Sequence, residues 1–298
     1  MHTALRRSAC ALSLLLLVAC GPGRPKLIAS AEGFQTPESV RYDPELDVLF
    51  VANINGNPNA RDNNGFISRL TPFGRVADLS FITGGRGDVV LNAPKGMAIT
   101  GDTLWVADID AVRAFNKRTG APILSLDLSS VHAVFLNDVV AGPDGSLYIT
   151  DTGIQFAETM THPGPDRIFK IGAGWAVSVA AEGDTLGAPN GITWDRRGAR
   201  FVIVPSARAT ILGWTEGHAP EVIATGPGGY DGIEYLKDGR ALVTSWTDSS
   251  VYLLKRDGTM SRYIQDVASP ADLGLDTKRN HVALPRSMAN KVEIWEIR

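Results

Sequence analysis

Six short segments of the chain share one pattern, in which four residues open on a proline or bulky apolar residue and close on an aliphatic residue or methionine. They are Pro37–Val40, Pro94–Met97, Leu136–Val139, Pro189–Ile192, Tyr230–Ile233 and Pro270–Leu273. The segments begin 40 to 57 residues apart. A repeat of about 40 residues, lengthened by insertions, is typical of a β-propeller. Six repeats predict an all-β fold of six blades with four strands each.

A β-rich run follows each shared segment after a turn. The runs are residues 49–53, 104–108, 147–151, 201–204, 241–244 and 281–284. A third element comes next, marked each time by two apolar residues three positions apart. Such a pair alone would also fit a helix, but the flanking turns and the six-fold recurrence favour strands. The extra length falls in residues 54–65, 80–92 and 152–166, which we expect to form loops that shape a pocket mouth.

The last repeat lacks a fourth strand, because the chain ends at Arg298 directly after its third predicted strand. Residues 26–33 resemble residues 221–226, the predicted fourth strand of the fourth repeat. We therefore expect the N-terminal strand to complete the last blade. Pairing the two ends of the chain in one blade would close the ring and remove its open edge.

The first 20 residues are predicted to be a lipoprotein signal peptide, with a basic start and an apolar run over residues 11–19. The apolar run is too short for a comfortable membrane span. Residues 17–20 resemble a bacterial lipobox, which would make Cys20 the lipidated first residue of the mature chain; an ordinary secretory peptide is the alternative. Residues 21–25 would be a short tether and residues 26–298 the propeller. We expect a protein lipid-anchored in the bacterial cell envelope, on the periplasmic or outer face.

Composition narrows the range of partners. The formal net charge is −3 and no long Lys/Arg run occurs, so nothing electrostatic favours nucleic acid. The only other cysteine, Cys10, lies in the predicted signal peptide, so the mature domain has no disulfide. We expect a monomer that binds a small molecule and touches the membrane only through its anchor.

The second residue of each shared segment gives the candidate site. These residues are Glu38, Lys95, Asn137, Asn190, Asp231 and Ala271. The first strand of each propeller blade lines the central channel, so these side chains should converge on one axis. Two carboxylates and two amides suit Ca²⁺, with water or substrate completing the shell. Zinc is disfavoured because the ring has no histidine and the domain no cysteine beyond its first residue.

Several readings of this ring stay open. Asn-Gly and Asp-Gly often mark turns, so a hydrogen-bonded ring without metal is the alternative to a cation site. Lys95 would offset carboxylate charge, bind a substrate oxygen or point into solvent. Asp138 would support Asn137 or cap a turn. Trp246 lies just past a second strand and is a candidate for the pocket wall.

The chain resembles the SMP-30/gluconolactonase family and its paraoxonase relatives. The resemblance rests on the Glu of residues 36–40, the Asn-Asp of 136–145, the Asn-Gly of 188–192 and the Asp-Gly of 230–233. It implies a catalytic divalent metal, usually Ca²⁺, in the channel of a six-bladed propeller that hydrolyses lactones or esters. By the same resemblance, Glu38, Asn137, Asn190 and Asp231 would be the metal ligands, with Asp231 as base or nucleophile.

Two residues depart from that family pattern. Phe135 stands where sugar-lactone members often have arginine, and Lys95 where paraoxonase-type members have histidine. We therefore expect Lys95, Phe135 and Trp246 to line the substrate site and a sugar lactone to be disfavoured. The leading hypothesis is a metal-dependent lactone or ester hydrolase. The alternatives are a non-catalytic binding module with a structural Ca²⁺ and a phosphotriesterase-like hydrolase.

Overall fold

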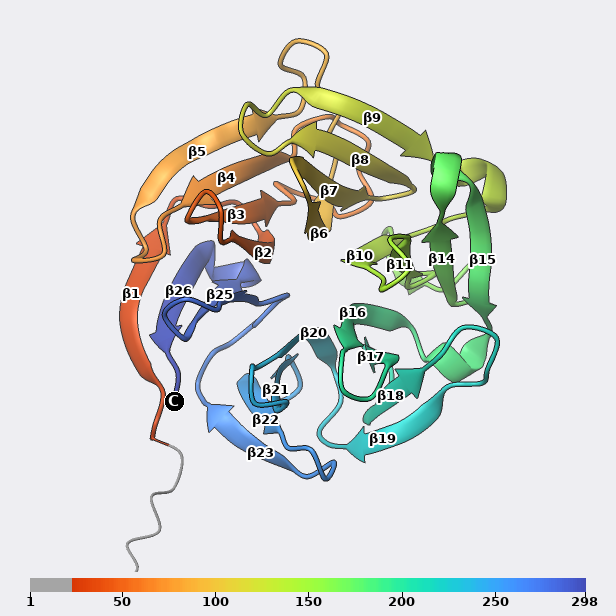
Figure 1. The fold of residues 1–298 in the computed structure, drawn as a ribbon. Coiled ribbons are helices and arrows are strands. Elements are labelled where there is room, and N and C mark those ends of the chain that lie inside the picture. The colour runs from red at the N-terminus through yellow and green to blue at the C-terminus, as the bar shows by residue number, and fades with distance from the viewer. Residues whose placement is uncertain (1–22) are drawn as a thin grey trace, which may run out of the picture.

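The structure, a computed structural model, describes residues 23–298. Six four-stranded antiparallel sheets surround a central channel, so the predicted six-bladed propeller is confirmed (Figure 1). The predicted signal peptide with Cys20 and the first residues of the predicted tether lie outside the described residues. No helix in the described part is both long and apolar enough to span a bilayer.

The first three blades follow chain order, each from its innermost to its outermost strand. Blade one holds β2 (Pro37–Asp43), β3 (Val48–Asn53), β4 (Phe66–Leu70) and β5 (Val76–Thr83). Blade two holds β6 (Pro94–Thr100), β7 (Thr103–Asp108), β8 (Ala111–Asn116) and β9 (Pro122–Asp127). Blade three holds β10 (Leu136–Ala141), β11 (Leu147–Asp151), β14 (Arg167–Ile171) and β15 (Val177–Glu182).

Blades four and five keep this order, and blade six takes its outer strand from the start of the chain. Blade four holds β16 (Pro189–Asp195), β17 (Arg200–Pro205), β18 (Thr210–Trp214) and β19 (Glu221–Thr225). Blade five holds β20 (Tyr230–Tyr235), β21 (Ala241–Ser245), β22 (Ser250–Leu254) and β23 (Met260–Ile264). Blade six holds β24 (Gly274–Asp276), β25 (His281–Arg286), β26 (Lys291–Glu296) and β1 (Lys26–Glu32).

The N-terminal strand closes the ring as predicted. β1 pairs antiparallel with β26, from Lys26 opposite Glu296 to Glu32 opposite Lys291. The last blade thereby gains its fourth strand from the opposite end of the chain. The outer edge of β26 is covered, and no unpaired third strand is left to associate with another chain.

Hydrophobic clusters fill the spaces between neighbouring blades. One joins Val51 of blade one to Ile294 of blade six, and another joins Leu242 of blade five to Leu284 of blade six. Each fully buried aliphatic side chain contributes about 1.5–3 kcal/mol relative to an exposed one. Contacts between blades therefore hold the ring together, and the axis itself is left to polar residues.

The innermost strands start at the same end of the channel. Between blades one and six, Val40 N donates to Asp272 O (3.1 Å) and Asp272 N donates to Glu38 O (2.8 Å). Ser39 and Asp272 form a parallel bridge, which fixes the relative direction of these two segments. We call the end where the inner strands start the ring end. The opposite end, with the turns from first to second strands, is the hairpin end.

The insertions lie at the ring end. Residues 54–65 follow β3, and a hairpin of β12 (Gln155–Phe156) and β13 (Met160–Thr161) occupies part of 152–166. The middle insertion begins later than predicted, because β5 extends to Thr83. Four short 3₁₀ turns complete the described elements: Ser129–Val131, Ala173–Trp175, Asp184–Leu186 and Ser287–Ala289.

The sixth inner strand is shorter than the others. β24 begins only at Gly274, and the segment before it makes isolated bridges through Pro270 and Asp272. Ala271, the sixth ring position, is buried with no polar side chain, so the sixth blade contributes no ligand at that position.

Candidate metal centre

Polar residues at the ends of the second strands anchor the backbone that leads into the inner strands. Asn53, Asp108 and Asp151 end β3, β7 and β11 and are fully buried. Their side-chain oxygens accept hydrogen bonds from Gln35 N (3.1 Å), Ala93 N (2.8 Å) and Phe135 N (2.8 Å), respectively. Each acceptor thus fixes the entry of its blade's inner strand two or three residues before the ring position.

Three of the four predicted ligands present a buried oxygen without a partner. Glu38, Asn137 and Asp231 are each the second residue of an inner strand and are buried. Glu38 Oε2, Asn137 Oδ1 and Asp231 Oδ1 accept no hydrogen bond from any described residue. An unsatisfied buried polar group costs about 1–3 kcal/mol, and more when it is charged. Three such oxygens in one channel indicate a site built for a further electropositive group.

The remaining polar atoms of these side chains are held in place. Asn137 Nδ2 donates to Thr152 Oγ1 (3.0 Å), which leaves the amide oxygen as the free atom. Trp246 Nε1 donates to Asp231 Oδ2 (2.7 Å). Asn190, the half-buried fourth member, donates from Nδ2 to Tyr230 O at 3.4 Å. The side chains are therefore oriented before any ligand binds.

Buried negative charge exceeds buried positive charge around the channel. The buried or half-buried groups are Glu38, Asp138, Asp231, Glu234 and Asp272, against Arg41 and Lys95. Burial raises the pKa of Glu38 well above its usual value, and the charges of Asp231 and Asp272 raise it further. Burial also raises the pKa of Asp231, again with Asp272 adding to the rise. A divalent cation would offset this excess.

The donor set fits a hard cation bound through oxygen. Within residues 23–298 no three His, Cys, Asp or Glu side chains form a metal-binding cluster, so the two carboxylates alone do not suffice. The amide oxygens of Asn137 and Asn190 would have to complete the set, and carbonyl oxygens are ligands that Ca²⁺ accepts. The candidate site therefore favours Ca²⁺ over zinc.

The match to known proteins agrees with this architecture. Residues 36–272 match the model of the SMP-30/Gluconolactonase/LRE-like region. The chain belongs to this family. None of the curated proteins compared with it matches. The matched residues include all four predicted ligands and extend from the start of blade one to Asp272.

Several solved structures superpose on the chain. A gluconolactonase from Xanthomonas campestris is 13% identical, with a TM-score of 0.65 over 94% of this chain and 96% of that one. Regucalcin from Agrobacterium tumefaciens, a calcium-binding protein, is 17% identical, with a TM-score of 0.65 over 92% and 95%. Virginiamycin B lyase from Staphylococcus aureus is 13% identical, with a TM-score of 0.63 over 92% and 100%. At such identities the likeness shows the fold alone.

Lys95 is a buried departure from the family pattern. Its side chain is 1% exposed, which excludes the solvent-facing option. Nζ donates to Ala93 O (3.1 Å) and Pro58 O (3.2 Å) and lies 4.1 Å from the centre of the Phe135 ring. Burial lowers the pKa of Lys95 to about 8, although nearby acids, Asp108 first, oppose that shift. Lys95 thus holds the 54–65 insertion against the channel and moderates the charge of Glu38.

Aromatic residues surround the ring end near these groups. The buried Phe135 packs against Phe156 of the β12–β13 hairpin, with ring centres 5.6 Å apart. Phe156 N donates to Asn59 Oδ1 (2.8 Å), so the insertions of blades one and three meet. Trp246 is 41% exposed. The three predicted substrate residues thus share one end of the channel, but Trp246 also contacts Asp231, a role the sequence did not reveal.

Two residues near the site were not predicted. Arg41 lies three residues after Glu38, and its guanidinium pairs with Asp138 (3.2 Å), Asp272 (3.1 Å) and Glu234. Asp272 also accepts a hydrogen bond from Ser39 Oγ (2.6 Å), and its Oδ1 accepts none from residues 23–298. In the sequence, Asp272 could have been recognised by its place one residue after a ring position, the same place that Asp138 holds in its own repeat.

Asp138 makes more contacts than support of Asn137 or capping of a turn would require. Its carboxylate accepts hydrogen bonds from Val139 N (2.8 Å) and Ile192 N (2.9 Å) in addition to Arg41. It therefore ties blade three to blade four and to the arginine of blade one. Because Asp138 directly follows Asn137, this network supports the candidate ligands from the hairpin end of the channel.

Proposed function

We propose that the protein is a Ca²⁺-dependent hydrolase of lactones or related esters. The observation that carries the proposal is the set of three buried, unpartnered oxygens on Glu38, Asn137 and Asp231. Family membership supports a lactonase-type propeller. A purely hydrogen-bonded ring would leave these oxygens without partners, which favours the cation site over that alternative.

The chain's own residues supply positioning and a base. Bound at the ring, the cation would polarise the substrate carbonyl and offset charge developing on its oxygen. Asp231 Oδ2 is fixed by Trp246, while Oδ1 has no partner among the described residues. Asp231 would accept a proton from the attacking water and return it to the leaving alkoxide, giving the hydroxy acid. Direct attack by its carboxylate on the carbonyl is the other role open to it.

The surroundings of the ring favour an apolar substrate. Phe135 and Phe156 pack together beside Lys95, and the half-exposed Trp246 stands next to Asp231. No sugar hydroxyl would find a hydrogen-bond partner on an apolar side chain such as Phe135. We propose a lactone or ester with an aliphatic or aromatic substituent, bound by Phe135 and Trp246, with Lys95 as the nearby positive charge.

A substrate panel with matched variants tests this proposal. The purified protein should hydrolyse apolar lactones or aryl esters with Ca²⁺ and lose turnover with a chelator. Asp231→Asn should abolish turnover with the fold intact, whereas Asp257→Asn, on an exposed turn of the same blade, should not. Inactivity on lactones, esters and phosphotriesters, with Ca²⁺ still raising the unfolding temperature, would instead favour the binding module with a structural cation. Activity confined to phosphotriesters would favour the phosphotriesterase-like hydrolase.

We also propose that the protein is anchored to a membrane of the cell envelope through Cys20, as a monomer. The support is the lipobox-like pattern of residues 17–20. Expression with a labelled fatty acid should label the wild-type chain and not Cys20→Ser. Equal labelling of both chains would refute the anchor, and release of an unlabelled protein would favour the ordinary secretory peptide.

A further inference from the structure

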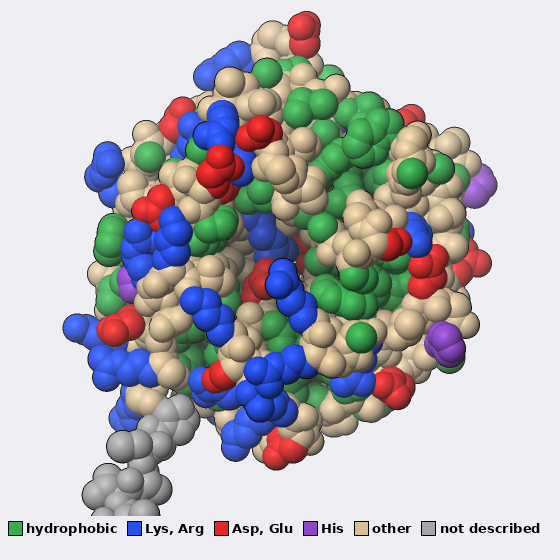
Figure 2. Space-filling view, in the orientation of Figure 1, with side chains coloured by type: hydrophobic (Ala, Val, Ile, Leu, Met, Phe, Trp, Pro, Cys, Tyr) green, Lys and Arg blue, Asp and Glu red, His purple; other side chains and the backbone are tan. Residues whose placement is uncertain are grey.

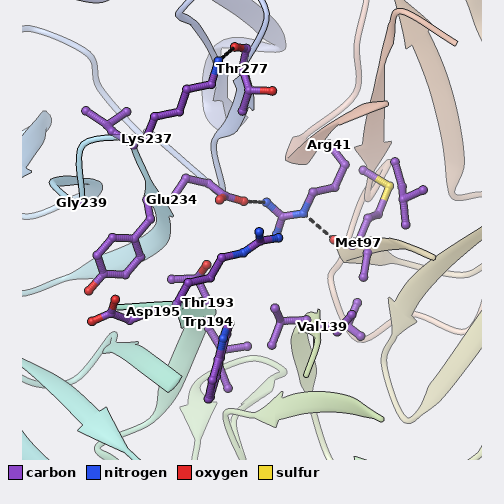
Figure 3. A pocket seen from close by; sticks show the side chains of 18 of the residues that line it. Arg41, Met97, Val139, Thr193, Trp194, Asp195, Glu234, Lys237, Gly239 and Thr277 are labelled. Carbon is purple, nitrogen blue, oxygen red and sulfur yellow. Dashed lines mark hydrogen bonds and ion pairs between the residues drawn. The ribbon is translucent and has the colours of Figure 1, made fainter. Parts of the chain in front are cut away.

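A cavity lies at the hairpin end of the channel, away from the candidate metal centre. Its volume is about 670 Å³, within the range of about 300–1,000 Å³ typical of small-molecule sites. The later residues of β2, β6, β10, β16 and β20 line it, together with the turns that follow β16 and β20 (Figure 3). None of the four predicted metal ligands lines this cavity.

The Arg41 network separates the two sites. Arg41 lines the cavity and pairs with Asp138, Glu234 and Asp272, while its Nε donates to Met97 O. The guanidinium therefore contacts residues of blades two, three, five and six from its place on blade one. Its three acidic partners occupy its charge, so a ligand of the cavity must be recognised by other groups.

The walls of the cavity differ in chemistry. One wall is apolar and comes from β6 and β10: Met97, Ala98, Ile99, Val139, Val140 and Ala141. The other carries Arg196 and Arg197 from the turn after β16 and Lys237 from the turn after β20. Figure 2 shows this hollow with basic side chains gathered on one side and hydrophobic ones on another.

The three cations of the second wall have no acidic partner. Within residues 23–298 the side chains of Arg196 and Arg197 make no hydrogen bond or ion pair, and Lys237 Nζ donates only to Thr277 O (2.6 Å). Of the two acids lining the cavity, Glu234 pairs with Arg41. Asp195 accepts a hydrogen bond from Arg197 N (3.0 Å) and lies 3.9 Å from Arg200. The wall therefore presents uncompensated positive charge.

We propose that this cavity binds an amphipathic anion, with a carboxylate or phosphate head on Arg196, Arg197 and Lys237 and a hydrocarbon body against β6 and β10. Guanidinium groups bind carboxylate and phosphate with two parallel hydrogen bonds. The apolar wall excludes water from the body of the ligand. This site is distinct from the proposed lactonase centre and does not depend on a cation there.

Calorimetric titration with octanoate and octyl phosphate tests the site. Both should bind more tightly than octanol, which lacks the charge, and than acetate or inorganic phosphate, which lack the chain. The double variant R196A/R197A should weaken octanoate binding about tenfold or more. Both arginines are exposed, so the fold should be kept, and R86A, an exposed arginine outside the cavity, is the matched control. Octanoate binding equal to that of octanol, or unchanged in the double variant, would overturn the proposal.

Vesicles distinguish the source of the anion. If the ligand is a free amphiphile, octanoate binds and sedimentation with phosphatidylglycerol vesicles stays at the level of phosphatidylcholine. If it is a lipid, both octanoate and phosphatidylglycerol vesicles bind, and R196A/R197A weakens both. Vesicle binding without octanoate binding would show a charged surface rather than this cavity, and would refute the proposal. Hydrolase activity, measured in parallel, reports separately on the ring.

Discussion

At the scale of residues, the site depends on which atom of each side chain is left without a partner. The sequence identified Glu38, Asn137 and Asp231 as oxygen donors, but not that one oxygen of each would be buried and free. The partners that fix the other atoms come from distant positions, such as Trp246 for Asp231 and Thr152 for Asn137. Trp246 is therefore a positioning residue as well as part of the apolar surroundings.

Replacing Trp246 tests that positioning role. Trp246→Phe keeps an aromatic ring and removes the N–H that donates to Asp231 Oδ2. A hydrogen bond to a charged group contributes about 1.5–3 kcal/mol, so kcat should fall about 10- to 100-fold. KM should change little if the substrate contacts only the aromatic side chain at position 246, which the variant keeps. Trp175→Phe, at an exposed tryptophan of blade three, is the control, and equal kinetics in both variants would refute the role.

The raised pKa values of Glu38 and Asp231 predict a pH-dependent response to Ca²⁺. Without a cation, burial raises the pKa of Glu38 and Asp231 in the folded chain, so the folded state holds protons that the unfolded state has lost. Stability is then greatest below their ordinary values and falls as pH rises through the folded values. Ca²⁺ competes with these protons, so its stabilisation should grow with pH. Unfolding temperatures at about pH 5 and about pH 8, with and without Ca²⁺, measure this; a larger Ca²⁺ effect at the lower pH would contradict it.

At the scale of elements, the inner strands of blades one, two and three depend on the last residue of the neighbouring second strand. Asp151 ends β11 and accepts hydrogen bonds from Val134 N (3.0 Å), Phe135 N (2.8 Å) and Gly153 N (3.1 Å). The structure shows that it holds together the chain before β10 and the insertion after β11.

Removing that acceptor should destabilise blade three. Asp151→Ala would leave up to three N–H groups unpaired, two of them in buried hydrogen bonds, at about 1–3 kcal/mol each. We expect a loss of about 3 kcal/mol or more in the free energy of unfolding, measured in urea. Ca²⁺ affinity should fall too, because β10 carries Asn137. Asp184→Ala, at an exposed aspartate after β15 whose carboxylate pairs with no described residue, should change neither; equal stability of the two variants would refute the anchoring role.

Local pattern and long-range contact explain what the sequence could predict. The six β-rich runs follow from residue patterns within about 40 residues, and the closing strand follows from the likeness of residues 26–33 to residues 221–226; the structure confirms both. The meeting of Phe156 with Asn59 joins positions 97 residues apart, and no periodic pattern encodes it. Arg41 was missed for the same reason, since its partners lie on three other blades. The shortened β24 was missed because its segment matches the repeat as well as the other five do.

At the scale of the whole molecule, one strand pair closes the ring. β1 and β26 pair along six positions, so blade six is held by contacts between residues near opposite ends of the chain. The ring of candidate ligands draws on blades one, three, four and five. Closure therefore affects the candidate metal centre although neither closing strand contributes a ligand.

Deleting β1 should open the ring and weaken the site at once. A chain starting at Gly33 would expose the edge of β26, whereas one starting at Gly23 keeps the pair. We expect the shorter chain to unfold at a lower temperature and to self-associate through its free edge, measured by calorimetry and size-exclusion chromatography. Its Ca²⁺ affinity should fall because Glu38, on the neighbouring blade, is held through the backbone of Asp272. A synthetic peptide of residues 23–33 should restore the fold by pairing with β26. A shorter chain that remains monomeric, as stable as the longer one and equally able to bind Ca²⁺ would show that contacts between blades suffice without closure.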